Sequence, residues 1–261
     1  MKRERAREPD VLLVSDVHGA FEALHRVAAT REPLLILGDL VNLVDYRTME
    51  GIIPDIVGRG LVEETIEARA RGREDHAEEA WRRGVALLDI DVGARVREVM
   101  EAEYRKMSDA LEGASAYVIH GNVDSPDLLE EHLPAGCAYV DGKVLEIEGV
   151  TVGFAGGGVQ RIGSRGEISD DTMRQKLALL GPVDVLCTHI APALPMLAED
   201  VIGGSSKGSE PVLDYLDEHQ PRFHFFGDIH QPRAITYDRG TTRCVNVGYF
   251  RATGRPTRHP A

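Results

Sequence analysis

The chain has 261 residues, and its 43 acidic and 30 basic side chains give a formal net charge of −13. Hydrophobic residues make up 43% and charged residues 28%, which is ordinary for a globular protein and excludes a largely disordered chain. An acidic surface repels polyanions, and no lysine and arginine stripe alternates with aromatic residues, so a long nucleic acid is not an expected partner.

The first ten residues are charged, like the start of a signal peptide, but the apolar run that follows is only Val11–Val14. A signal peptide needs about 7–15 apolar residues at this point, and no segment approaches the roughly 20 of a membrane span. Cys137, Cys187 and Cys244 form an odd set without CxxC spacing, which is typical of reduced thiols. We therefore expect a soluble, cytoplasmic protein with no membrane partner. The sequence does not indicate the oligomeric state.

Short apolar runs rich in β-branched residues predict buried strands along the chain. They are Val11–Ser15, Leu34–Leu37, Ala116–His120, Val150–Phe154, Val183–Thr188, Phe223–Phe226 and Cys244–Val247.

Helical patterns lie between some of these runs. They are the stripe of Phe21, Leu24, Val27 and Ala28, the stretch around Leu177 and Leu180, and the group Val212, Leu213 and Leu216, for which Ser209 is a candidate N-cap. Strands that alternate with helices predict an α/β fold. The tail after Phe250 is polar and is expected to be loose.

Residues 42–113 interrupt this alternation, because they contain almost no strand signal and much Glu, Arg and Ala. Apolar residues at steps of three and four predict a helix over Val92–Leu111, and a second helix is expected over Leu61–Arg83. A structureless loop of this length would be rare. We interpret the segment as a helical insertion within a single domain of residues 1–261, which covers the site or mediates self-association. His76 and Trp81 within it are interpreted as surface or packing residues.

Polar residues that can bind metal follow five of the predicted strands. They are Asp16, His18, Asp39, Asn122, His189, Asp228 and His230. In open α/β sheets, ligands gather outside the carboxyl ends of the strands, so these side chains are expected to converge. Carboxylate, imidazole and amide oxygen suit Mn²⁺, Fe, Zn²⁺ or Co²⁺ better than Ca²⁺ or Cu(I). A metal pair would also supply the local positive centre that phosphate chemistry needs on an acidic protein.

Each of these motifs has a plain structural reading when taken alone. Asp16 can cap a helix, Gly38-Asp39 and Gly121-Asn122 can be turns, and His189 can be a hydrogen-bonded histidine. Asp228 and His230 are more specific, because alternation turns both to one side. The ordered series carries the metal hypothesis, since turn chemistry alone would not produce it.

The series DVHG, GD, GNVD, TH and GDIH resembles the calcineurin-like metallophosphoesterases, which show D-x-H, G-D, G-N-H-D/E, a lone His and G-H-x-H in this order. The resemblance covers roughly Val11–Asn42 and Ala114–Gly248 and leaves out the helical insertion. It implies a four-layer α/β/β/α sandwich, in which two mixed sheets pack face to face with helices outside.

Carried over residue by residue, the resemblance implies two divalent metal ions, with Mn favoured among Mn, Fe, Zn and Co. One ion would be held by Asp16, His18, Asp39 and His230, and the other by Asp39, Asn122, His189 and Asp228. Such a pair, about 3.5–4 Å apart, clamps phosphoryl oxygens and activates a bridging hydroxide. Asp39, Asn122 and His189 are the catalytic residues that this resemblance implies.

Two departures from the family pattern affect the expected chemistry. Val123 stands where the family has a histidine that helps the leaving group, and the lost acid is worth about 10²–10⁴-fold. His120 is a candidate substitute, although it can point to the other side of its strand. Asp228 stands where the family has a histidine, so a ligand is kept while the cluster becomes less positive. This change is expected to weaken water activation and to favour Mn²⁺ or Fe²⁺.

Weaker candidates for substrate contact are Arg161, Arg165 and Lys207. The arginines can bind a phosphate through their guanidinium groups, and Lys207-Gly208-Ser209 can bind an anion through backbone N–H groups or simply cap a helix. Gly156–Gly158 is interpreted as structural, and Asn246 as either a site residue or a turn residue.

The predicted function is metal-dependent hydrolysis of a small phosphoester, with a phosphodiester favoured because Val123 removes the acid. The alternatives are a phosphomonoesterase and a binding or scaffold protein that kept the fold and lost turnover.

Overall fold

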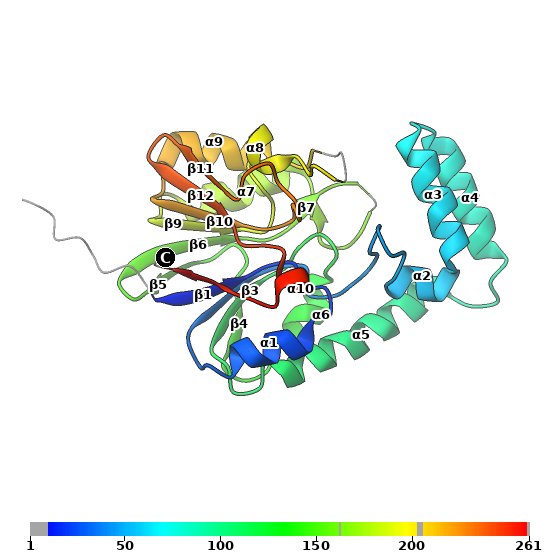
Figure 1. The fold of residues 1–261 in the computed structure, drawn as a ribbon, viewed down its shortest axis with the longest axis horizontal. Helices are drawn as coiled ribbons and strands as arrows, with labels where there is room; N and C mark the ends of the chain where they lie inside the picture. Colours follow the sequence, from blue (N-terminus) through cyan, green and yellow to red (C-terminus); the bar gives the residue numbers. More distant parts are fainter. Residues whose placement is uncertain (1–9, 162, 203–205, 260–261) are drawn as a thin grey trace, which may run out of the picture.

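Two sheets form from the buried apolar runs in the computed structural model, which describes residues 10–161, 163–202 and 206–259 (Figure 1). The first sheet has the order β13-β1-β2-β3-β4. Its strands are β1 (Val11–Val14), β2 (Leu34–Leu37), β3 (Ala116–Ile119), β4 (Cys137–Tyr139) and β13 (Thr257–His259). The strands β1 to β4 are parallel, with Leu13 opposite Leu35, whereas β13 is antiparallel to β1.

The second sheet has the order β11-β12-β10-β9-β6-β5. Its strands are β5 (Val144–Ile147), β6 (Val150–Ala155), β9 (Val185–Thr188), β10 (Phe223–Phe226), β11 (Thr236–Arg239) and β12 (Thr242–Asn246). The four central strands are parallel, and antiparallel β5 and β11 form the edges. A small parallel pair, β7 (Gly158–Val159) and β8 (Glu167–Ile168), lies outside both sheets.

Three apolar layers hold these sheets between helices. Leu13 and Leu35 of the first sheet pack against Phe154 and Phe225 of the second. The other face of the first sheet is covered by α1 (Phe21–Ala28), α5 (Val92–Ala110) and α6 (Pro126–Glu131). The other face of the second sheet is covered by α7 (Asp170–Leu180), α8 (Pro195–Ala198) and α9 (Glu210–His219) (Figure 1). The predicted four-layer α/β/β/α sandwich of two mixed sheets is confirmed.

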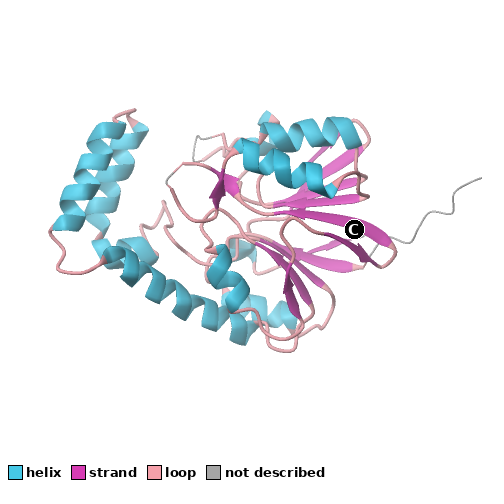
Figure 2. Ribbon diagram, turned by 180° about the vertical axis from the view of Figure 1, so that it is seen from behind, coloured by secondary structure: helices cyan, strands magenta, loops and turns pink. Residues whose placement is uncertain are grey.

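The segment expected to be a helical insertion consists of α2 (Ile52–Val57), α3 (Arg59–Ala70), α4 (Glu74–Ala86) and α5. Helix α5 buries Met100, Tyr104 and Met107 against the first sheet, in agreement with the apolar stripe. Helices α3 and α4 form a hairpin that projects away from the two sheets (Figures 1 and 2).

The single helix expected over Leu61–Arg83 is wrong, because the chain reverses between α3 and α4. Gly72 takes a left-handed conformation with φ of 68°, which glycine adopts without steric cost and which ends a helix. The reversal lets Leu61 of α3 lie directly against Gly84 of α4.

The expectation that the tail after Phe250 is loose is also wrong for residues 251–259, while residues 260–261 lie outside the described residues. Phe250 is fully buried and starts α10 (Phe250–Thr253), after which β13 pairs with β1. The His259 ring packs edge-on against Phe223 and Phe225. Pairing with a distant strand orders the segment, and its own composition does not reveal this.

Within the described residues, no helix combines the length and the apolar character needed to cross a bilayer. The three cysteines are free thiols, as predicted.

Candidate metal centre

The seven predicted ligands lie in loops that directly follow β1, β2, β3, β9 and β10. Backbone hydrogen bonds join these loops within each sheet: the Asp16 N–H donates to Gly38 O over 3.1 Å, and the Gly227 N–H donates to His189 O over 2.8 Å. The Asp228 N–H donates to Asp16 Oδ1 over 3.2 Å and so joins the loops of the two sheets. Parallel strands in both sheets therefore bring the five loops to one edge.

One group of ligand atoms consists of Asp16 Oδ1 and the Nε2 atoms of His18 and His230. They lie within 4.8 Å of one another, close enough to share one cation. The two imidazole nitrogens are 3.2 Å apart, and His230 Nε2 lies 3.3 Å from Asp16 Oδ1.

A second group consists of Asp16, Asp39 and His189, whose ligand atoms also lie within 4.8 Å of one another. His189 Nε2 lies 3.4 Å from Asp39 Oδ1 and 3.2 Å from Asn122 Oδ1. The other oxygen of Asp39, Oδ2, lies 3.6 Å from His18 Nε2. Asp39 thus presents one oxygen to each histidine group, which is the arrangement that a bridging carboxylate requires.

Hydrogen bonds to backbone carbonyls fix the histidine tautomers in a ligand-ready form. His189 Nδ1 lies 2.7 Å from Leu37 O, and His18 Nδ1 lies 3.2 Å from Val41 O. A carbonyl oxygen only accepts, so each Nδ1 carries the proton and donates it. Each Nε2 is therefore the atom that would bind a cation once it has lost its own proton, as in most protein metal sites.

The buried carboxylates of this region are better suited to binding a cation than to hydrogen bonding alone. Asp16 is fully buried, and its Oδ2 atom has no hydrogen-bond partner among the residues that the structure describes. Asp39 and Asp228 are buried as well, at 3% and 4% exposure. A buried carboxylate oxygen without a partner, such as Asp16 Oδ2, is costly, and a divalent cation would remove this cost. The donors present therefore fit the metal ions that the sequence predicts.

The backbone is strained at several of the predicted ligands. Asp16, His18, Asp39 and Asp228 have φ values of 59°, 42°, 55° and 62°, so four of the seven predicted ligands are left-handed. Residues other than glycine rarely adopt this region, and the strain costs about 1–3 kcal/mol at each position. Strained positions of this kind cluster at functional sites.

Comparison with known proteins agrees with this geometry. The model of the calcineurin-like phosphoesterase family matches residues 9–232. The chain belongs to this family. Its membership makes the chain a hydrolase of the metal-dependent phosphoesterase type, with the Asp and His groups able to bind the metal.

Solved structures share the fold at low sequence identity. One crystal structure superposes with a TM-score of 0.59 and 15% identity, covering 94% of this chain and 92% of the other. The crystal structure of TT1561 of Thermus thermophilus gives a TM-score of 0.51 and 13% identity, covering 97% and 98%. A comparison with curated protein sequences gave no significant match.

Asp124 and Tyr104 hold the loops that carry Asp39 and Asn122 in place. The sequence alone did not reveal either role. Asp124 Oδ2 accepts the N–H groups of Asp39 and Gly121, each over 2.8 Å. Its Oδ1 accepts the Leu40 N–H over 3.0 Å and the Tyr104 hydroxyl over 3.2 Å. Burial and the nearby Asp39 raise the pKa of Asp124 to about 6. The last letter of GNVD was a signal for Asp124, whereas Tyr104 only looked like another apolar position of its helix.

Lys207 faces the candidate metal centre with its side chain, whereas the sequence suggested that its backbone N–H groups bind an anion. Ser209 caps α9 by accepting the Val212 N–H over 3.4 Å, so the helix start is closed by a side chain. The Lys207 ammonium donates to Asp228 Oδ1 over 3.1 Å. Asp228 is therefore tied to a cationic side chain and belongs to neither of the two ligand groups above. The expected loss of positive charge at position 228 is offset by this ammonium.

The two arginine candidates are held by other groups. The Arg165 guanidinium lies 3.2 Å from Asp127 in an exposed ion pair. The Arg161 guanidinium donates to Ser206 O, and its backbone N–H donates to Glu167 over 2.9 Å. Of these two, only Arg161 lies beside the segment that carries Lys207.

His120 points away from the predicted ligands. Its Nδ1 lies 2.7 Å from the Tyr139 hydroxyl and 3.8 Å from Asp141. Burial lowers its pKa to about 4, so the ring is neutral at pH 7. Among the described residues, no hydrogen bond or ion pair joins the His120 side chain to a predicted ligand, so it does not take the place of the missing family histidine.

The remaining candidates from the sequence, Asn246 and the glycines of residues 156–158, have structural roles. Asn246 donates to Ile229 O over 2.8 Å and accepts the Gly248 N–H over 2.9 Å, which fixes the loop of Asp228 and His230. Gly158 packs directly against the Asn122 side chain. Tyr249 stacks on His230 with ring centroids 3.9 Å apart, a contact without a sequence signal. His76 and Trp81 lie on the projecting hairpin, where His76 faces Glu64 at 3.9 Å.

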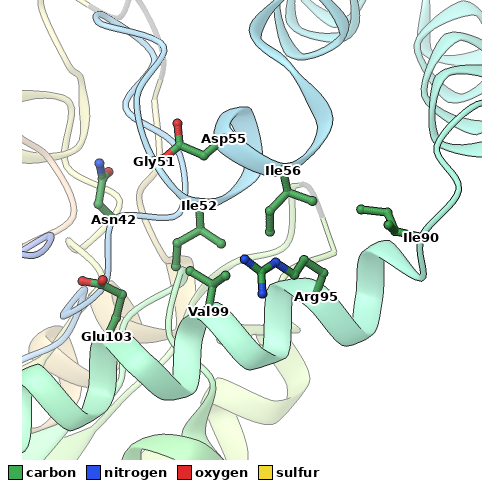
Figure 3. Close-up of a pocket in the computed structure, with 9 residues that line it drawn as sticks. All are labelled: Asn42, Gly51, Ile52, Asp55, Ile56, Ile90, Arg95, Val99 and Glu103. Carbon is green, nitrogen blue, oxygen red and sulfur yellow. The ribbon is translucent and has the colours of Figure 1, made fainter.

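A pocket of about 510 Å³ lies between α2 and α5, next to the start of the helical segment (Figure 3). It is lined by Asn42, Gly51, Ile52, Asp55, Ile56, Ile90, Arg95, Val99 and Glu103. None of the predicted ligands lines it, so this pocket is separate from the candidate metal centre.

The stability of the metal-free protein should depend on the protonation of His189. Burial disfavours the imidazolium, but the Asp39 carboxylate outweighs it and raises the pKa of His189 to about 10. A histidine in an unfolded chain titrates near about 6.5, so the folded state binds the extra proton between these values. This contribution is complete below about pH 6.5 and is lost as the pH rises through about 10.

Urea unfolding with a chelator present, at about pH 7 and about pH 9.5, measures this effect. The free energy of unfolding of the wild type should fall at the higher pH, and in His189→Gln it should fall less. An equal fall in both proteins would show that His189 does not carry the proton.

Proposed function

We propose that this protein hydrolyses a small phosphodiester with two divalent cations, Mn²⁺ being favoured, in the cytoplasm. One cation would be held by Asp16, His18, Asp39 and His230, and the other by Asp39, Asn122, His189 and Asp228. The observation that carries the proposal is the position of Asp39, whose Oδ1 lies 3.4 Å from His189 and whose Oδ2 lies 3.6 Å from His18. A single carboxylate between two histidine groups suits a pair of cations.

A pair of cations, when bound, clamps the phosphoryl oxygens and lowers the pKa of a water molecule between them. The residues of the chain supply the position of these charges. Asp124 holds the Asp39 backbone, the Leu37 and Val41 carbonyls orient the two histidines, and Asn246 holds the loop of His230. Because these groups are fixed before substrate binds, little reorganisation is needed during the reaction.

The preference for a diester with a good leaving group rests on the lack of a free acid near the centre. Val123 is apolar, packs against the apolar layer between the first sheet and helices α1, α5 and α6, and donates its N–H to Asp39 Oδ1 over 3.1 Å. His120 is engaged with Tyr139. In the part of the chain that the structure describes, the histidines beside Asp39 are all predicted ligands. The leaving oxygen is therefore left without protonation by an imidazole.

The test compares aryl phosphodiesters with aryl phosphomonoesters in the Mn²⁺-loaded protein. We expect kcat/KM to be at least about tenfold higher for the diester and to fall steeply as the pKa of the leaving phenol rises, since acid help of about 10²–10⁴-fold is missing. A higher kcat/KM for the monoester would favour the monoesterase. Bound metal without turnover across a broad ester panel would favour the scaffold protein.

A further inference from the structure

Asp228 differs from the other two buried carboxylates of the centre in its partner. Asp16 and Asp39 face histidines, whereas Asp228 Oδ1 lies 3.1 Å from the Lys207 ammonium. Among the described residues, this is the one ion pair that joins a lysine or an arginine to a predicted ligand. The ammonium lies where it would meet a cation that Asp228 helps to hold.

The backbone around Lys207 is closely packed and hydrogen-bonded, which fixes the position of this residue beside Asp228. The Lys207 N–H donates to Ala198 O over 3.0 Å, and two residues later the Ser209 N–H donates to Ala191 O over 2.9 Å. Between them, a Cβ on Gly208 would lie 2.5 Å from the Ala193 Cα, so the segment is packed closely. The Lys207 side chain is only 29% exposed. The backbone of Lys207 is thus held on both sides, and its partly buried side chain places the ammonium beside Asp228.

The positive charge of Lys207 should weaken the binding of a divalent cation at Asp228. Three carboxylates attract cations, and an ammonium beside one of them repels a divalent ion at that carboxylate. In a partly buried site this repulsion is larger than at an exposed surface, because the effective dielectric constant is lower. Among the described residues, no lysine or arginine forms an ion pair with Asp16, His18 or His230.

We propose that Lys207 competes with a divalent cation for Asp228 and makes the two metal sites unequal. This inference rests on the proposed two-cation site. The cation held by Asp16, His18 and His230 binds tightly. The cation near Asp228 binds more weakly and exchanges more readily, so occupancy of the centre depends on the metal concentration.

Calorimetric titration of the metal-free full chain with Mn²⁺ tests the proposal without relying on activity. The wild type should show two steps of different affinity. Lys207→Met keeps the length of the side chain and removes its charge, and we expect it to tighten the weaker step by about tenfold or more while the tighter step changes by less than about threefold. Lys207→Arg keeps the charge and should keep two unequal steps.

Two controls isolate the role of the ion pair. Lys176 forms a similar pair with Asp141 at 2.8 Å and contacts none of the predicted ligands, so Lys176→Met should leave both steps unchanged. In Asp228→Asn, adding Lys207→Met should have a smaller effect than in the wild type, because the shared carboxylate is absent. Thermal unfolding of each variant with a chelator checks that the fold is retained.

The Mn²⁺ titrations of the wild type and the variants distinguish competition by Lys207 from the alternatives. A weaker step that tightens in Lys207→Met, with two unequal steps kept in Lys207→Arg, would support the competition. An unchanged or weaker second step in Lys207→Met would overturn the competition and would show that Lys207 positions Asp228 or plays no part. Two equally tight steps in the wild type would overturn this inference and leave the proposed function standing, whereas no metal binding at all would overturn the proposed function.

Discussion

Replacing Asp39 by asparagine should reduce phosphodiester turnover by at least about 10³-fold, because the metal pair supplies several kcal/mol of charge stabilisation. Asp39 lies between His18 and His189, so its loss affects both sites. We also expect calorimetric titration with Mn²⁺ to show that Asp39→Asn binds fewer ions per chain than the wild type.

The fold should survive this substitution. Asparagine keeps an oxygen that can accept the Val123 N–H, and the Asp39 backbone stays bonded to Asp124. Thermal unfolding with a chelator should therefore remain cooperative, although its midpoint should fall because the ion pair between Asp39 and His189 is lost. Asp127→Asn is a matched control, because Asp127 is an exposed carboxylate paired with Arg97 and Arg165. Full activity and two bound ions in Asp39→Asn would exclude Asp39 as the bridging group.

Replacing Gly121 by alanine should destabilise the protein and weaken metal binding together. A Cβ at this position would lie 2.5 Å from the Asp39 backbone nitrogen and closer still to its Oδ1. Asp39 cannot easily move away, because Asp124 ties its N–H to that of Gly121. We expect a loss of about 1–3 kcal/mol or more, as for other overpacked buried sites. Urea unfolding and Mn²⁺ titration measure the two effects.

Gly60 provides the matched control for this substitution. It lies in α3, and a Cβ there would meet no atom within 4 Å. Gly60→Ala should be neutral or stabilising by up to about 1 kcal/mol, since alanine has the higher helix propensity. If Gly121→Ala matches Gly60→Ala in stability and metal affinity, close approach to Asp39 is not what glycine provides at this position.

The order of strands and ligands could be predicted because it depends on local pattern. Each buried run is short and β-branched, and each polar ligand directly follows one, so a parallel sheet brings them to one edge without further information. The apolar stripe of α5 is equally local. These parts of the fold need only the two periods of 2 and 3.6 residues.

Other features depended on contacts between distant residues and could not be predicted in this way. The tail was misjudged because β13 is polar by composition and is held by β1 and by Phe223 and Phe225. The turn at Gly72 was missed, although the glycine itself was a signal. Tyr104 gave no signal, because its hydroxyl finds Asp124 only after α5 has packed against the first sheet.

The sequence by itself determined which residues bear the chemistry, since the carboxylates, the imidazoles and the glycines between them occur in an order that turns alone do not explain. Only the tertiary structure decided which partner each of these residues meets. Asp228 and Lys207 are 21 positions apart along the chain and form an ion pair, and His120 is one residue from Gly121 yet faces Tyr139. The physical reason is that a side chain's charge and donor atoms belong to the residue, whereas its partners are set by packing between segments that are far apart in the chain.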